Sequence, residues 1–179
     1  MTDSRFRSDQ IMRINDAAAF AEELVSNHYK LSAAQWLRRK YDVKTAVDLS
    51  ANEIISGPFA QVIRYEGRKT DADLKSEAFD FYKICLQDHA ILDALEHLPS
   101  LQLFPFSLYI ITHELIHIVR FTKFLQSFVA TPEERHAEEI RVHAKTHEIL
   151  KPVSIPGMRS VFSFYARWRN DFDSLRNLD

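Results

Sequence analysis

Residues 109–121 read YIITHELIHIVRF, an almost unbroken apolar stretch that nevertheless contains His113, Glu114 and His117. Burying a polar or charged group without a partner costs several kcal/mol. The stretch therefore predicts a buried helix whose ionisable groups are either satisfied by the fold or bind a ligand. Because positions i and i+4 of a helix share one face, the imidazoles of His113 and His117 can reach a single metal ion.

The composition is that of a globular chain. The 179 residues are 46% hydrophobic, which is enough for a substantial core. A net charge of −2 argues against a nucleic-acid or anionic membrane surface. Cys85 is the only cysteine, which excludes an internal disulfide and a cysteine zinc cluster. The N-terminus is polar and no long uncharged apolar run occurs, so we expect a cytoplasmic protein with no membrane and no nucleic-acid partner.

Local signals predict an all-α protein. The chain has 3 glycines and 6 prolines and lacks Asn-Gly and Asp-Gly hairpin dipeptides. We expect a bundle of about six to seven helices in a single helical domain over 1–179. Within it, 1–66 is a candidate N-terminal subdomain and 70–175 the bundle around the motif. The expected helices lie at 17–27, after Ser32, at the Ser50–Glu53 capping box, between Pro58 and Gly67, over 71–98, 107–127 and 132–150, and after Gly157.

A second helix is expected to complete the site. Thr131, Pro132 and Glu134 form a helix start, with Thr as the cap, Pro at the first position and Glu at the third. The short connection predicts that this helix packs antiparallel to the motif helix. His143 then lies nearly level with His117, and Glu139 within about 5 Å of that level along the axis. Catalytic zinc usually has three protein ligands, so the third is Glu139 or His143.

The HExxH sequence of His113–His117, with its flanks YIIT and IVRF, resembles the active-site helix of zincin metallopeptidases. The stretch ERHAEEIRVHAKTHEIL, 134–150, resembles the following helix of the gluzincins, in which a glutamate is the third ligand. The resemblance implies Glu139 or Glu138 as that ligand, Glu114 as the general base and a peptide or amide bond as the substrate. It covers about 13 residues plus the weaker acidic match. Zincins also place a β-sheet beside the motif helix, and no strand is evident here.

The leading interpretation is a zinc-dependent, peptidase-like hydrolase acting on a peptide or small molecule. One alternative is a ferritin-like di-iron protein, because Glu114/His117 and Glu133/His136 have Glu-x-x-His spacing. A second is a protein similar to the DinB family, which binds a metal through three histidines, the third being His28 or His89. A third is a structural site closed by His113, His117, Glu139 and His143. Without a metal, the two motif histidines are core residues and Glu114 pairs with Arg120 or another cation. Assembly into a homo-oligomer is compatible with each of these interpretations.

Overall fold

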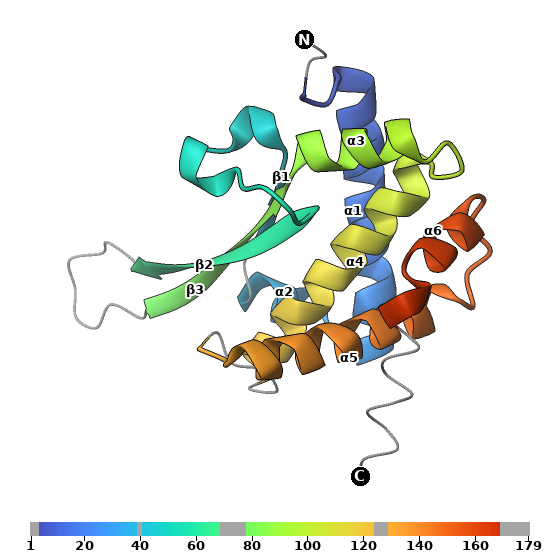
Figure 1. Cartoon of the computed structure of the whole chain (residues 1–179). Helices are drawn as coiled ribbons and strands as arrows, with labels where there is room; N and C mark the ends of the chain where they lie inside the picture. Colours follow the sequence, from blue (N-terminus) through green and yellow to red (C-terminus); the bar gives the residue numbers. More distant parts are fainter. Residues whose placement is uncertain (1–3, 39–40, 69–77, 124–128, 169–179) are drawn as a thin grey trace.

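The computed structural model describes residues 4–38, 41–68, 78–123 and 129–168. Figure 1 shows a central helix with a sheet on one side and further helices around it. The elements in chain order are α1 Ser8–Tyr29, α2 Ala33–Arg38, β1 Tyr41–Lys44, the 3-10 helices η1 Ala46–Asp48 and η2 Ala51–Glu53, β2 Ala60–Arg68, β3 Ala78–Leu86, α3 Asp88–His97, α4 Leu103–Thr122, α5 Pro132–Leu150 and α6 Met158–Phe164.

A three-stranded mixed sheet makes the protein α/β, so the all-α prediction is wrong. The strand order is β1-β3-β2, with β1 parallel and β2 antiparallel to β3. Strand β2 occupies the helix expected after Pro58, and β3 lies inside the helix expected over 71–98. Both contain β-branched and aromatic residues, which favour strands once a partner strand satisfies their backbone groups. Of the rest of that expected helix, Asp88–His97 is helical as α3, and 71–77 lies outside the described residues.

Several helix boundaries were predicted correctly. Helix α5 begins at Pro132, where the Thr131 hydroxyl accepts from the Glu134 amide and the Glu134 carboxylate accepts from the Thr131 amide. The capping box of Ser50 and Glu53 is present, although the helix it starts is the short 3-10 helix η2. Of the expected motif helix over 107–127, residues 107–122 are helical in α4, and 124–128 lie outside the described residues.

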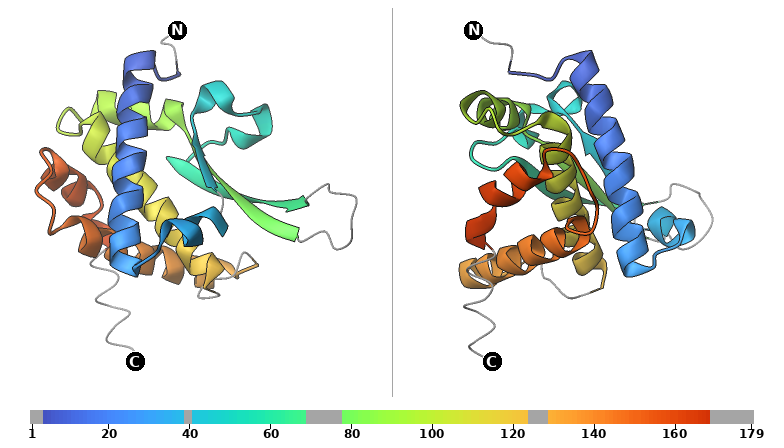
Figure 2. Two further views of the ribbon diagram at one scale, coloured as in Figure 1. Left: turned by 180° about the vertical axis from the view of Figure 1, so that it is seen from behind. Right: turned by 90° about the vertical axis from the view of Figure 1, so that its right-hand side faces the viewer.

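Helix α4 lies at the centre of the molecule. Its flanks are covered by α1, which runs along it, and by the sheet on another side (Figures 1 and 2). The apolar residues of α4 join one buried cluster that also takes side chains from α1, β3 and α6, including Ile14, Ala21, Ile84 and Val161. Burial of most of its residues explains why the sequence of α4 is apolar on nearly every face. No helix among the described residues could cross a membrane.

Helix α5 crosses α4 instead of lying along it as an antiparallel neighbour, as both views in Figure 2 show. A crossing brings only a few turns of each helix into contact. The turns that meet carry the histidines of the HExxH sequence on α4 and the Glu-rich stretch of α5. The crossing point therefore decides which side chains of the two helices face one another.

Candidate metal centre

Helix α4 contributes two imidazoles whose Nε2 atoms converge. The Nε2 atoms of His113 and His117 lie 3.1 Å apart. Both residues are buried, with 7% and 5% of their surface exposed. Their spacing of four positions places them one turn apart on the same face of the helix. The Nδ1 atom of His113 is buried and has no hydrogen-bond partner among the described residues.

Helix α5 contributes the carboxylate of Glu139, which reaches both imidazoles. Its Oε2 lies 3.1 Å from Nε2 of His113, and its Oε1 lies 3.0 Å from Nε2 of His117. Burial opposes ionisation of Glu139, but the hydrogen bonds from the two histidines outweigh it and hold the carboxyl pKa well below its usual value. Although 41% of the side chain is exposed, its charged end is held against the two rings.

These spacings fit one metal ion. Donors that lie 2.0–2.1 Å from a tetrahedral zinc are about 3.3 Å from one another. The three separations among His113, His117 and Glu139 are 3.0–3.1 Å, slightly shorter than that value. Two imidazoles and one carboxylate are also a donor set that zinc uses in catalytic sites. The chemistry and the spacing of the three side chains are therefore compatible with a zinc ion.

His143, one turn after Glu139 on α5, lies near the same place but farther from the other donors. Its Nε2 is 4.0 Å from Oε2 of Glu139. Its Nδ1 is 2.8 Å from the hydroxyl of Tyr109, and the Trp168 ring stacks on it with centroids 4.7 Å apart. Burial, with a smaller effect of nearby His113, lowers the pKa of His143 to about 2, so its ring is neutral at physiological pH.

Two overlapping groups of donors thus share His113 and Glu139. The donor atoms of His113, Glu139 and His143 lie within 4.8 Å of one another, which is compatible with a metal site as well. The group completed by His117 is tighter, since its two imidazole nitrogens lie 3.1 Å apart and each is within 3.1 Å of one of the two Glu139 oxygens. A tetrahedral zinc ion has donors about 3.3 Å from one another, so the tighter group is the better candidate set of metal ligands.

Neighbouring Glu138 faces away from this group. Its carboxylate accepts hydrogen bonds from Nε and Nη2 of Arg120 on α4, the latter at 3.1 Å, and it is 6% exposed. Arg120 therefore pairs with Glu138, whereas the metal-free interpretation pairs it with Glu114. Of the two adjacent glutamates, the structure turns Glu139 toward the imidazoles.

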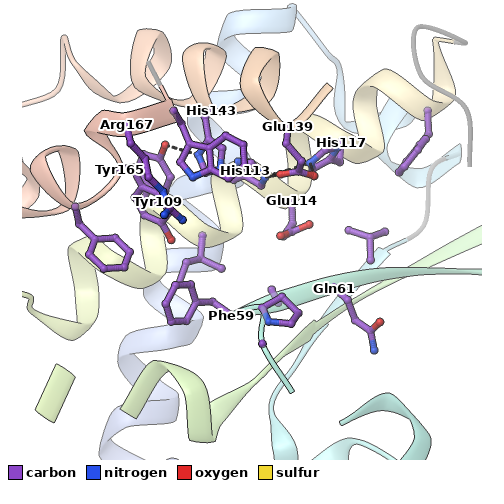
Figure 3. Close-up of a pocket in the computed structure, with 18 residues that line it drawn as sticks. Phe59, Gln61, Tyr109, His113, Glu114, His117, Glu139, His143, Tyr165 and Arg167 are labelled. Carbon is purple, nitrogen blue, oxygen red and sulfur yellow. Dashed lines mark hydrogen bonds and ion pairs between the residues drawn. The ribbon is translucent and has the colours of Figure 1, made fainter. Parts of the chain in front are cut away.

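Glu114 points into an open cavity beside the two histidines. Figure 3 shows its carboxylate directed into the space between α4 and the strand side of the cavity, where Phe59 and Gln61 lie. Burial raises the pKa of this carboxyl, and the two adjacent histidines counteract the effect in part. The carboxylate belongs to neither donor group, so it is placed to contact a molecule in the cavity.

The cavity has a volume of about 840 Å³ and is enclosed by several elements. Residues from the start of β2, from α4 and α5, and from the segment after α6 line it (Figure 3). Sequence reasoning missed much of this wall, because helical spacing of Tyr165 and Trp168 indicates only an amphipathic helix. Burial raises the pKa of the Tyr165 hydroxyl far above its usual value. Apart from the residues of the HExxH sequence, the wall residues are brought together by tertiary packing and share no sequence motif.

Other predicted ligands do not join the cavity wall. His28 and His89, the third ligands considered for a three-histidine site, are not among the lining residues. His136, needed with Glu133 for a di-iron site, is exposed near the start of α5. These positions leave the group around His113 as the place where a metal fits.

Comparisons with known proteins found no counterpart: no protein-family model matches the chain, and no characterised protein or solved structure matches it significantly.

Proposed function

We propose that this protein is a zinc-dependent hydrolase that cleaves peptide or amide bonds. His113, His117 and Glu139 would hold the ion, and Glu114 would act as the general base. Two observations together carry this proposal: the imidazole Nε2 atoms of His113 and His117 lie 3.1 Å apart, each 3.0–3.1 Å from one oxygen of the Glu139 carboxylate, and the carboxylate of Glu114 points into a cavity beside them. A lone HExxH sequence is a weaker argument, because it also arises by chance.

The roles of the residues follow from the chemistry of hydrolysis. The ion would supply a lowered pKa for a coordinated water and a polarised substrate carbonyl. Glu114 would accept a proton from the attacking water as the water oxygen bonds to the carbonyl carbon. It then passes the proton to the nitrogen when the C–N bond breaks, so that an amine and a carboxylic acid leave.

The sheet supports a peptide over a small molecule as the substrate. Among the described strands β2 pairs only with β3, so it is an edge strand. Residues 57–62, which lead into and begin β2, line the cavity across from Glu114. The unpaired N–H and C=O groups of an edge strand can hydrogen-bond to an extended peptide. A peptide lying along β2 would pass the candidate metal centre.

The test combines metal analysis with one substitution. Full-length protein purified without chelator is expected to bind one zinc ion per chain and to cleave dye-labelled casein. Glu114→Gln should keep the ion and lose activity by a factor of about 10²–10⁴, the usual contribution of a general base. Glu148→Gln, an exposed change on α5, is the matched control and should retain activity. Loss of metal from Glu114→Gln would show that Glu114 is a ligand and that the mechanism is wrong.

A structural site is the second candidate function. It is favoured by the nearness of His143, whose donor atom lies within 4.8 Å of those of His113 and Glu139. With His117 this gives four protein donors, the number found in closed, non-catalytic zinc sites. The two candidates therefore differ in what His143 does.

A further inference from the structure

We infer that His143 is a hydrogen-bond donor to the substrate's carbonyl oxygen and not a ligand of the ion. The inference rests on the proposed function and deepens it, because it assigns the fourth polar group of the site. If His143 is not a ligand, the centre has three protein ligands and a position left open for substrate, as catalytic zinc sites do. Figure 3 shows His143 beside His113 and Glu139 at the upper wall of the cavity.

The distances from His143 to the other donors place it outside the set of three proposed metal ligands. Its Nε2 is 4.0 Å from the nearer Glu139 oxygen, about 0.7 Å beyond the 3.3 Å expected between tetrahedral donors. The other three donors already meet that spacing. A group that lines the cavity just outside the three proposed ligands is instead placed to donate a hydrogen bond to a substrate oxygen beside them.

Its neighbours keep His143 at that distance. The Tyr109 hydroxyl lies 2.8 Å from Nδ1, and the two rings are roughly parallel with centroids 5.9 Å apart. Trp168 stacks on the imidazole at an interplanar angle of 21°. His113 packs against it as well, with ring centroids 4.3 Å apart. These contacts restrict both rotation of the ring and its approach to the ion.

The contact with Tyr109 is compatible with the tautomer that the role requires. When the hydroxyl donates to Nδ1, the neutral ring carries its proton on Nε2, which lies toward Glu139 and the cavity. A ligand would need the opposite tautomer, with a lone pair on Nε2. In this assignment His143 donates a hydrogen bond and transfers no proton, while Tyr109 is a positioning residue.

The experiment uses the full chain loaded with cobalt(II), whose visible absorption reports the number and type of ligands. His143→Phe removes the donor but keeps a flat ring beside Trp168. Tyr109→Phe/His143→Phe avoids leaving a buried hydroxyl unpaired, in case the single variant folds poorly. His97→Gln is the control, because it removes an exposed imidazole on α3 that is not among the lining residues of the cavity. The probe is acetohydroxamate, which binds metals through two oxygens.

We expect the cobalt spectrum of each folded His143 variant to equal that of the wild type. Acetohydroxamate should bind about tenfold more weakly, the loss that one hydrogen bond accounts for. Tyr109→Phe should also weaken the probe with an unchanged spectrum. A changed cobalt spectrum in the His143 variants would show that His143 is a ligand. An unchanged affinity for acetohydroxamate would show that His143 does not bond to the substrate's oxygen. Either result overturns this inference and leaves the proposed function standing. A wild type that binds no cobalt or zinc overturns the proposed function together with it.

Discussion

The Nε2 atom of His113 on α4 lies 3.1 Å from Oε2 of Glu139 on α5, although 26 positions separate the two residues. The same carboxylate reaches His117 at 3.0 Å. The three donors are thus positioned by the crossing of two helices that are held by other contacts. A site that is formed by the fold in this way binds an ion without further ordering, which favours tight binding.

Metal binding should stabilise the folded protein. At a free zinc concentration 100 times the dissociation constant, binding only to the folded state adds about 2.7 kcal/mol. For a chain of this size that gain raises the melting temperature by about 5–10 °C. Differential scanning calorimetry with zinc and then with EDTA measures it. His113→Gln and Glu139→Gln should lose most of the zinc-dependent shift, whereas an equal shift in all three proteins would place zinc elsewhere.

The buried ion pair between Arg120 and Glu138 should control the alignment of α5 on α4. It lies one position from Glu139 and one turn from His117, and both side chains are largely buried. Glu138→Gln leaves the guanidinium without its charged partner, which we expect to cost about 3–5 kcal/mol of unfolding free energy. Zinc affinity should fall as well, because Glu139 loses its alignment. Urea denaturation and a competitive zinc titration measure the two effects.

Two further variants separate alignment from general stability. Arg141 also approaches Glu138, at 3.7 Å, but is 54% exposed, so Arg141→Gln should change stability by less than about 1 kcal/mol. Arg120→Leu/Glu138→Leu should regain much of the stability, since apolar residues can replace a buried pair. If this double variant bound zinc as the wild type does, the ion pair would have no part in aligning Glu139.

Acid should weaken the contact between η2 and the sheet at Glu53. This carboxylate, 3% exposed, accepts hydrogen bonds from Lys83 and Tyr65, each at 2.7 Å, and from the Ser50 amide. These bonds lower its pKa from the usual 4.5 to about 2. A depressed pKa means that the stabilisation is fully present above pH 4.5 and is lost as the pH falls toward 2.

Glu53→Gln should therefore lower the thermal midpoint at pH 7, with the difference from the wild type shrinking steadily below pH 4.5. Circular dichroism melts between pH 7 and pH 2 provide the measurement. The exposed residue Glu23 on α1 offers a control, because Glu23→Gln should follow the wild type. A gap between Glu53→Gln and the wild type that stays constant over this range would exclude titration of Glu53 as the cause.

Gly157 should be required for the turn that leads into α6. Its φ is +83°, and an added Cβ would lie 3.1 Å from Cγ of Pro105 and 3.2 Å from the Gln102 amide oxygen. Gly157→Ala combines a left-handed backbone with crowding, so we expect a loss of about 1–2 kcal/mol or more. Gly57 also has positive φ but open space around it, so Gly57→Ala should cost less. Urea denaturation measures the loss of unfolding free energy from backbone strain alone in Gly57→Ala and from strain plus crowding in Gly157→Ala. Equal losses in the two variants would contradict the crowding at Gly157.

The strands show where sequence reasoning failed. Strands β2 and β3 contain charged and amide residues between short apolar groups, and no hairpin dipeptide marks a turn. The signal that was present is the enrichment of β2 and β3 in β-branched and aromatic residues, as at Val62, Ile63 and Tyr82. Because strand hydrogen bonds join residues distant in the chain, such as Ala60 and Leu86, periodicity within one segment does not reveal them.

The sequence by itself determined what depends on neighbouring positions. The Thr131 cap starts α5 through bonds to Glu134, and helical rise alone places His113 and His117 on one face. Tertiary structure decided the remainder, namely the sheet beside α4, the cavity wall and the choice of Glu139 over Glu138. That choice depends on the crossing angle of α5 on α4 and on the rotation of α5 about its axis. The packed core and the Arg120–Glu138 pair set this angle and this rotation together, and no spacing within one segment of the sequence encodes them.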